Sequence, residues 1–323
     1  MKKNLGFLDN LNPQLTTEKV FSANSTAILA LVTAIAALAF SPIFIRISEQ
    51  DLGAIAASFH CHWIAAVLLG FWNGLTSFFR QAEDRSSQPP ITEPTSVIAL
   101  LLFGGIFWSA TIWCWFWSLG QTSIANATLL RSLTPIFVTL GGWLVWGKKF
   151  DRRFIVGMIV AIIGSCAIAF DDLQIATTNL QGDVAALICA LLSGISLLIL
   201  EELRTKLKTS KILTWRLVLV ASLTLPIFLF TENNYFPNSW QTWTAIIAQA
   251  VICLLIGQGL IVYCLSHLSS SFVAVTFLVE PLLSASLAWV IFLERLNFSN
   301  WLAFFIVLIG IYLAKSSQSA GKI

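Results

Sequence analysis

Two ionisable residues, Arg131 and Glu280, lie inside long apolar stretches of the sequence. If these stretches cross a membrane as helices, Arg131 lies about 12 Å below the outer surface and Glu280 about 13–14 Å below it. A charge at that depth costs at least about 2.5 kcal/mol on insertion scales, so each side chain should face a partner or a water-filled cavity. We expect both to share one central cavity, as an ion pair or as alternating ligands for a substrate. A permanent buried pair that only fixes helix register is the structural alternative.

Each charge has a proline close behind it, Pro135 after Arg131 and Pro281 after Glu280. A proline inside a helix removes one N–H donor and frees the carbonyl four residues earlier. Such carbonyls are tolerated inside a membrane where they line protein or water. We therefore expect a kink near the midplane in both stretches, which gives each half of the protein a flexing point. Kinks that serve only packing are the alternative.

The two prolines belong to a weak internal repeat with an offset of 146 residues and no gap. At that offset Pro135 aligns with Pro281, and so do Leu119 with Leu265, Ser123 with Ser269, Trp143 with Trp289, Ile163 with Ile309 and Gly164 with Gly310. A repeated membrane unit with a proline in the matching helix of each copy is typical of a transporter's substrate site.

Three aromatic residues complete the candidate site. Trp108 lies near the middle of its apolar stretch, too deep for an interfacial belt, and could line a cavity for a ring-bearing or cationic substrate. Packing against lipid or core is at least as good an interpretation of Trp108. Trp117 aligns with Tyr263 in the repeat, so both copies have an aromatic residue just before the loop that leads to the proline-bearing helix.

The composition predicts an all-α integral membrane protein. Hydrophobic residues make up 57% of the chain and charged residues 11%, against about 25% charged residues in soluble domains. The apolar runs are near the length that crosses a hydrocarbon core, and they lack the alternation of β-barrel strands. We expect ten spans, at roughly 25–46, 54–78, 97–119, 124–146, 154–170, 182–201, 213–230, 244–265, 272–293 and 300–314.

Positive charge sets the orientation of these spans. With the N-terminus inside, the Lys and Arg residues gather on the cytoplasmic side, where Arg216 is counted as well. The outer ends hold only Arg46 and Arg295, and Arg131 lies within the membrane. This bias predicts a plasma- or inner-membrane protein with both termini in the cytoplasm. Glu201, at the end of the sixth span, is expected to snorkel to the interface or to lie in the cytoplasm.

Five spans per copy is an odd number, so the second copy starts from the opposite face and the repeats are inverted. The domains are then a first five-helix repeat at 25–170 and a second at 171–315. A polar cytoplasmic tail at 1–22, expected to be disordered, and a short tail at 316–323 flank them.

These features resemble the drug/metabolite transporter superfamily, specifically proteins with two EamA domains, over about residues 25–315. In the first copy the resemblance lies in "WSLGQTSIANATLLRSLTPIFVTLGGWLVWGKKF" followed by "GMIVAIIG". In the second it lies in "YCLSHLSSSFVAVTFLVEPLLSASLAWVIFLERL" followed by "AFFIVLIG". The first copy departs from the family pattern at Gly147-Lys148, where a "GE" pair is common. The resemblance implies a secondary carrier of small metabolites, often an exporter, with a central cavity lined by the fourth and ninth spans among others.

No signature of an enzyme occurs in the sequence: there is no GxSxG, HExxH or Walker loop and no pair of intramembrane aspartates. The six cysteines form no CxxC pair, so we expect neither a metal nor a cofactor. The predicted partners are a small-molecule substrate and the lipid bilayer, without nucleic acid, and a coupling proton or cation stays open. We expect an alternating-access permease or exporter. A membrane sensor or scaffold that does not transport, and an intramembrane enzyme, are the alternative classes.

Overall fold

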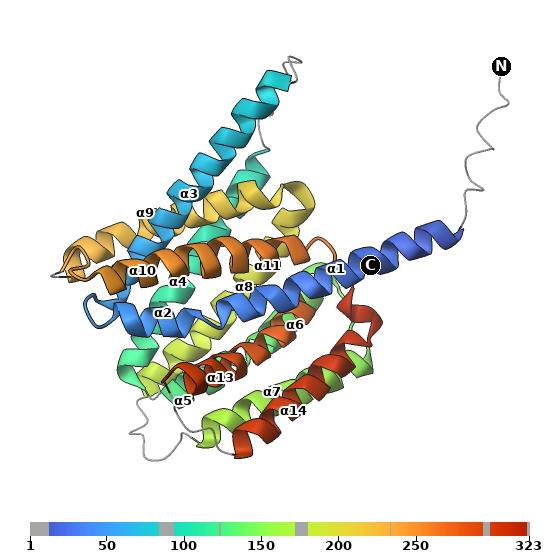
Figure 1. Cartoon of the computed structure of the whole chain (residues 1–323). Helices are drawn as coiled ribbons and strands as arrows, with labels where there is room; N and C mark the ends of the chain where they lie inside the picture. The colour runs from blue at the N-terminus through green and yellow to red at the C-terminus, as the bar shows by residue number, and fades with distance from the viewer. Residues whose placement is uncertain are drawn as a thin grey trace.

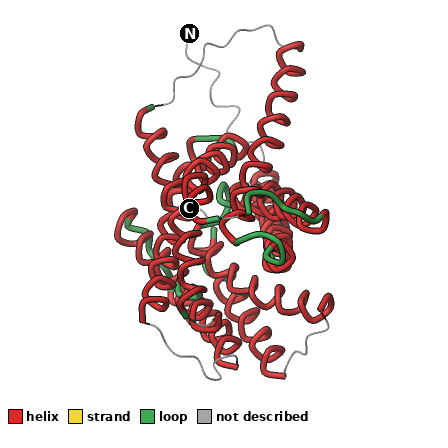
Figure 2. The backbone as a smooth tube through the Cα atoms, turned by 90° about the vertical axis from the view of Figure 1, so that its left-hand side faces the viewer, coloured by secondary structure: helices red, strands yellow, loops and turns green. Residues whose placement is uncertain are grey.

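A computed structural model of the chain describes residues 13–83, 94–122, 124–171, 180–232, 234–292 and 298–321. Within these ranges helices are joined by short loops and no β-strand occurs (Figure 2). Seven helical segments are long and apolar enough to cross a membrane: Ser25–Ser48, Ala54–Phe79, Thr95–Ser118, Ala127–Trp146, Leu180–Lys206, Thr209–Thr231 and Trp240–Cys264. Ser270–Ser284 and Leu302–Lys315 are shorter apolar helices. The prediction of an all-α membrane protein is confirmed.

Each expected span coincides with a helix or a group of consecutive helices. The first half contains α1 (Pro13–Leu38), α2 (Ser41–Ser48), α3 (Ala54–Glu83), α4 (Thr95–Gln121), α5 (Ile124–Arg131), α6 (Thr134–Trp146) and α7 (Arg152–Asp171). The second contains α8 (Leu180–Lys206), α9 (Thr209–Thr231), α10 (Trp240–Ala248), a π-helix (Gln249–Gln258), α11 (Gly259–Cys264), α12 (Ser270–Thr276), a 3₁₀ turn (Phe277–Val279), α13 (Glu280–Phe292), α14 (Phe298–Lys315) and a final 3₁₀ turn (Gln318–Ala320). Helix α1 begins twelve residues before the expected first span, inside the predicted tail; residues 1–12 lie outside the described part.

The contact between α7 and α14 shows that the two halves are inverted copies (Figure 1). A Cβ atom on Gly164 would lie 2.9 Å from the backbone nitrogen of Val307, and one on Gly310 would lie 2.4 Å from that of Ala161. The repeat offset matches Gly164 with Gly310 and Ala161 with Val307, so this is one contact made twice. Such reciprocity is what a two-fold axis produces.

The same contact between α7 and α14, which we call the seam, shows the relative direction of the two helices. Gly157, one turn before Ala161, approaches Ala314, one turn after Gly310. Positions rise along α7 while their partners fall along α14, so the helices are antiparallel. Equivalent helices that are antiparallel and related by a two-fold axis define an inverted repeat, which confirms the predicted inversion of the two repeats.

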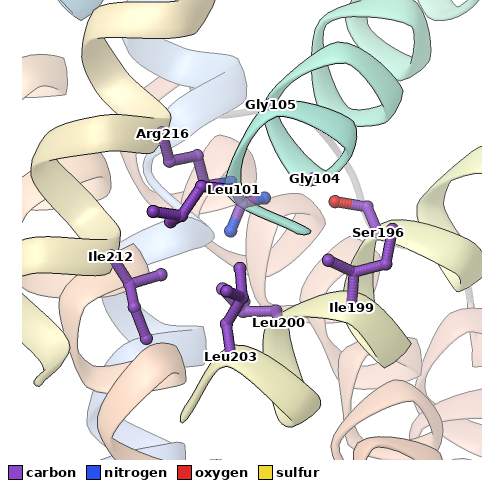
Figure 3. Close-up of a pocket in the computed structure, with 9 residues that line it drawn as sticks. All are labelled: Leu101, Gly104, Gly105, Ser196, Ile199, Leu200, Leu203, Ile212 and Arg216. Atoms are coloured by element: carbon purple, nitrogen blue, oxygen red, sulfur yellow. The ribbon is translucent and has the colours of Figure 1, made fainter. Parts of the chain in front are cut away.

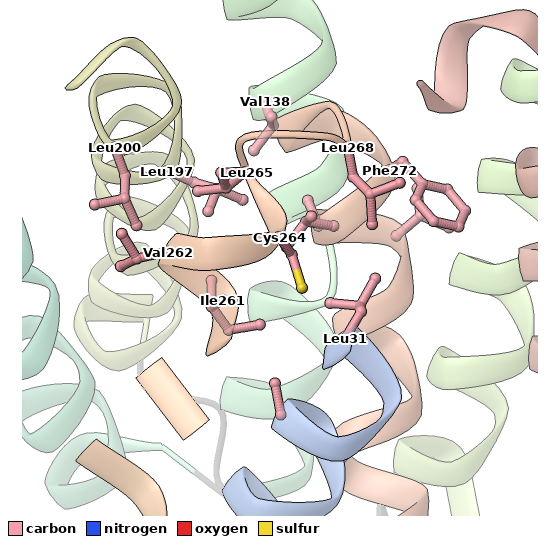
Figure 4. Close-up of a cluster of buried hydrophobic side chains, with 14 of the residues drawn as sticks. Leu31, Val138, Leu197, Leu200, Ile261, Val262, Cys264, Leu265, Leu268 and Phe272 are labelled. Atoms are coloured by element: carbon pink, nitrogen blue, oxygen red, sulfur yellow. The ribbon is translucent and has the colours of Figure 1, made fainter. Parts of the chain in front are cut away.

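The halves share one hydrophobic core. Figure 4 shows side chains of the first half meeting those of the second. Leu31 of α1 and Val138 of α6 belong to the same buried cluster as Leu197 of α8, Ile261 of α11 and Phe272 of α12. In a bilayer such packing, and not the exclusion of water, holds helices together. The polar groups between the halves are therefore surrounded by tightly packed apolar side chains.

Candidate functional site

Both proline-bearing spans are broken. Helix α5 ends at Arg131 and α6 begins at Thr134, with Pro135 in its first turn. Helix α12 ends at Thr276, a 3₁₀ turn follows, and α13 begins at Glu280 directly before Pro281. Proline is accepted in the first turn of a helix, where its missing N–H has no intrahelical partner. Each proline thus starts a new half-helix, and each charged residue stands at the break.

The backbone at the first break is satisfied locally. The Arg131 carbonyl, which Pro135 cannot reach with an N–H, accepts a hydrogen bond from the Thr134 hydroxyl at 2.7 Å. The Pro135 carbonyl also accepts a hydrogen bond, from the Thr139 hydroxyl at 2.7 Å. The expected freed carbonyl at Arg131 is therefore bonded within its own span.

Arg131 and Glu280 lie within electrostatic reach of each other across the two halves. The guanidinium carbon of Arg131 lies 4.6 Å from the ring centroid of Trp115 on α4, a cation–π contact. Among the described residues, neither Arg131 nor Glu280 forms a direct ion pair or a side-chain hydrogen bond. The two breaks thus bring a cation and an anion near each other and leave the hydrogen-bonding capacity of both unused.

The other predicted site residues are divided between the interior and the surface. Pro135 is buried, and Tyr263 is half-buried against the shared core with its ring 5.5 Å from that of His267. Trp108 is half-buried on α4, and its ring face is covered by Arg216 of α9, whose guanidinium carbon is 3.9 Å from the centroid. Trp117 is 60% exposed, so the structure does not bring it to Arg131 and Glu280.

Arg216 lies within the expected span 213–230, but its charge was counted with the cytoplasmic side. It is not in the cytoplasmic segment but in the membrane-spanning helix α9, seven residues after Thr209. Its guanidinium reaches a small cavity between α4, α8 and α9 (Figure 3). The lining residues are Leu101, Gly104, Gly105, Ser196, Ile199, Leu200, Leu203, Ile212 and Arg216. The cavity has room for about one water molecule, and it does not extend to Arg131 or Glu280.

Glu201 was expected to snorkel to the interface or to lie in the cytoplasm. It is instead buried in a polar cluster, which we call the latch: Lys148, Glu201 and Ser270. Glu201 Oε2 lies 2.7 Å from Lys148 Nζ. The same oxygen accepts the Ser270 N–H at 3.2 Å and the Ser270 hydroxyl. Lys148 comes from the first half, while Glu201 and Ser270 come from the second. The latch therefore ties the two halves together where α6, α8 and α12 end or begin.

The C-terminal segment extends this closure. The Ser317 hydroxyl donates to Asp151 Oδ1 at 2.5 Å, and the Ser269 hydroxyl donates to the Ser319 carbonyl at 2.9 Å. Asp151 precedes α7 in the first half, and Ser269 precedes α12 in the second. The hydrogen bond from Ser317, followed by that from the Phe154 N–H, holds the pKa of Asp151 below its ordinary value.

Two inverted repeats, each with a broken helix and a charge at the break, define a membrane transporter architecture. The model of the EamA-like transporter family matches residues 25–170 and 180–315. The chain belongs to this family, and is a non-enzymatic, multi-pass membrane transporter.

Named relatives fit that class. The pseudopaline exporter of Pseudomonas aeruginosa is 24% identical over 197 residues, which cover 61% of this chain and 68% of the exporter. The GDP-mannose transporter of Arabidopsis thaliana is 28% identical over 60% of this chain and 58% of its own length. An uncharacterized transporter of Archaeoglobus fulgidus is 23% identical over 91% of this chain and 99% of its own. A solved crystal structure shares the fold with a TM-score of 0.74 and 16% identity, covering 90% of this chain and 98% of that one.

Proposed function

We propose that this protein is a secondary transporter that moves a small metabolite or drug by alternating access. The substrate binds near the midplane between the two repeats, at Arg131 and Glu280. One observation carries the proposal: a cation and an anion stand at matching helix breaks of inverted repeats, within electrostatic reach and, among the described residues, without an ion pair or a side-chain hydrogen bond. Relatives named as exporters or sugar-nucleotide transporters support the same activity.

The two charges divide the work of holding a substrate. Arg131, fixed on the ring of Trp115, presents N–H donors to a carboxylate or phosphate group. Glu280 holds a cationic group of the substrate or takes a coupling proton. The breaks before Pro135 and Pro281 let α6 and α13 tilt relative to α5 and α12, while Trp108 and Tyr263 wall the route from either half. Trp117 lies at the outer entrance.

The latch then has a role in the transport cycle. Lys148 and Glu201 join the halves on the side that the positive charge bias assigns to the cytoplasm, together with both termini. Separation of this pair opens the site to the cytoplasm, and its re-formation closes that side. The seam of α7 and α14, packed backbone against backbone, is the place about which the halves rock.

The test begins with the purified, full-length protein in detergent. A thermal-shift screen of amino acids, nucleobases, organic acids and quaternary amines identifies ligands, and each ligand is then followed as flux into proteoliposomes. We expect at least one saturable flux that Arg131→Gln and Glu280→Gln abolish. Arg152→Gln removes an exposed charge at the start of α7 and should keep the flux.

Other outcomes would contradict the proposal in distinct ways. Flux that survives both substitutions would place the substrate elsewhere. Binding without any flux, together with a partner that binds irrespective of ligand, would favour a sensor or scaffold built on a transporter fold.

A further inference from the structure

Arg216 is a buried cation without a counter-charge. Its Nη1 atom is buried and has no hydrogen-bond partner, and among the described residues no carboxylate forms an ion pair with it. His62 of α3 lies within its electrostatic reach, but that ring donates from Nδ1 to the Ser58 carbonyl at 2.7 Å and cannot neutralise a cation. An unpaired arginine inside a membrane is costly and by default indicates a ligand or a transport pathway.

The setting of Arg216 repeats that of Arg131. Trp108 and Trp115 are seven residues apart on α4, so they lie on the same face of that helix. Each ring supports one guanidinium, with Arg216 on Trp108 and Arg131 on Trp115. The rings stand about 10 Å apart along α4. One helix therefore presents two aromatic-backed arginines in a row.

In the expected orientation, the two arginines also lie on opposite sides of the midplane. Arg131 is seven residues after Ile124 at the start of α5, and Arg216 is seven residues after Thr209 at the start of α9. At 1.5 Å per residue each stands about 10 Å from the end of its helix. In this orientation α5 starts at the outer face and α9 at the inner face. A solute that crosses the membrane therefore meets one arginine in the outer half and the other in the inner half.

We propose that Arg216 and Trp108 form a second binding station for the transported solute, and that this solute carries a carboxylate or phosphate group. The inference rests on the proposed transport function and specifies its substrate class. The proposed path of the solute passes two guanidiniums, those of Arg131 and Arg216, and one carboxylate, that of Glu280. Its net charge is therefore positive, which favours an anionic solute. A planar guanidinium is suited to bind both groups through paired N–H donors.

The cavity beside Arg216 supplies the space for this station. Ser196 adds a hydroxyl to its lining, and Gly104 and Gly105 leave the α4 backbone bare on that side (Figure 3). A Cβ atom on Gly105 would lie 2.6 Å from Leu219 of α9, so the two helices are in close contact here. Since the cavity holds about one water molecule, an anion enters when α9 moves away from α4. Occupancy is thereby coupled to the transport cycle.

The test measures binding to the full-length protein in detergent. The probes are inorganic phosphate, succinate and uridine monophosphate, with succinamide and uridine as uncharged counterparts. We expect at least one anion, and no uncharged counterpart, to raise the melting temperature saturably. Arg216→Gln should weaken that binding at least about tenfold through loss of charge-assisted hydrogen bonds, while Arg152→Gln, the same charge loss at an exposed position, should leave it unchanged.

Two further variants keep the test decisive if Arg216→Gln fails to fold. Arg216→Lys keeps the charge and loses the planar, stacked fork, and Trp108→Leu keeps an apolar side chain and loses the ring. Each should weaken anion binding several-fold in a monodisperse preparation. Unchanged affinity in both, equal binding of the uncharged probes, or no anion binding to the wild-type protein would overturn the proposal. A melting temperature that responds to phosphatidylglycerol in place of phosphatidylcholine, and to no soluble anion, would assign Arg216 to lipid and overturn it too.

Flux separates this inference from the proposed function. If the wild-type protein moves a neutral or cationic solute that needs Arg131 but not Arg216, transport stands and the second station is wrong. If anions bind at Arg216 but no solute crosses the membrane, the station stands and transport is wrong.

Discussion

Two polar clusters join the halves of this protein, and they differ in how completely their hydrogen bonds are made. In both, the cation comes from the first half and the carboxylate from the second: Arg131 with Glu280, and Lys148 with Glu201. At the latch one oxygen of Glu201 accepts from Lys148 and twice from Ser270. At the breaks, Glu280 accepts no hydrogen bond from any described residue.

This difference supports our proposal that the latch is a structural contact and that the breaks form a binding site. A buried polar network with all its partners rigidifies the structure around it, whereas a buried charge without partners is costly unless something else binds it. The latch is complete with the chain alone. The pair at the breaks makes no side-chain hydrogen bond with the described residues, and the buried Nη1 of Arg216 has no partner, which is why we propose both as places that a ligand completes. The expected effects of mutation on transport and on stability should therefore be opposite at the two clusters.

The largest contrast is expected in transport. Arg131→Gln should lower flux at least about 30-fold, because truncating one member of a buried charge pair that binds a ligand costs about 2–5 kcal/mol. Lys148→Gln should change flux by no more than about fivefold in either direction, since its side chain is 29% exposed and a pair of that kind contributes about 1 kcal/mol or less. Initial rates in proteoliposomes measure both. Equal losses in the two variants would erase the distinction between the clusters.

Stability should show the reverse order. Glu201→Gln should lower the free energy of unfolding by about 1–3 kcal/mol, because it leaves Lys148 and the Ser270 N–H without their charged acceptor. Glu280→Gln should leave stability unchanged or raise it, since a buried carboxylate without hydrogen bonds is unfavourable. Denaturant titration in mixed micelles measures both, with Glu202→Gln as control for an exposed pair with Lys206. A larger loss of unfolding free energy in Glu280→Gln than in Glu201→Gln would show that the pair at the breaks stabilises the fold and does not serve binding.

Much of the break region could be predicted from sequence because its determinants are local. The missing N–H of Pro135 and Pro281 fixes where a helix must begin, and the 146-residue offset shows that the two prolines occupy equivalent places. Counting residues along a helix placed Arg131 and Glu280 at one depth, and the structure brings them within electrostatic reach of each other without a direct ion pair. The inverted arrangement followed from the odd number of spans per copy, and the contacts of Gly164 and Gly310 confirm it.

The latch and the Arg216 station could not be predicted in the same way, because they depend on tertiary contacts. Glu201 lies at the end of an apolar run, where solvent is the natural expectation. It is buried because Lys148 arrives from a loop 53 residues earlier and Ser270 from 69 residues later. Arg216 is close to a predicted span boundary, where an error of a few residues moves a charge between cytoplasm and membrane. Its partner Trp108 was recognised as too deep for the interface, but nothing in the sequence identified the cation on its ring.

A smaller effect is expected from the backbone at the first break. Thr134→Val keeps the side-chain shape and removes the hydroxyl that donates to the Arg131 carbonyl. We expect a loss of about 1 kcal/mol in the free energy of unfolding, typical of one intramolecular hydrogen bond. The substitution should also change the turnover rate more than the substrate affinity, because the ligand-binding side chain stays in place. Thr76→Val, which removes a comparable hydroxyl on α3, is the control, and an equal change in turnover there would show that the break is not special.

The smallest effect should come from the C-terminal segment that flanks the latch. Because hydrogen bonds hold the pKa of Asp151 below its ordinary value of about 4, its contribution is complete above that pH and is lost as the pH falls through the lowered value. Asp151 is partly exposed, so the contribution is below about 1 kcal/mol. Hydrogen exchange at Ser319 and Ala320, corrected for intrinsic rates, should lose protection as the medium becomes more acidic than pH 4. Asp151→Asn should be poorly protected already at neutral pH and should show no such transition. Protection that is constant down to pH 2 in the wild-type protein would mean that the segment is held without Asp151, and that the latch closes this end of the molecule alone.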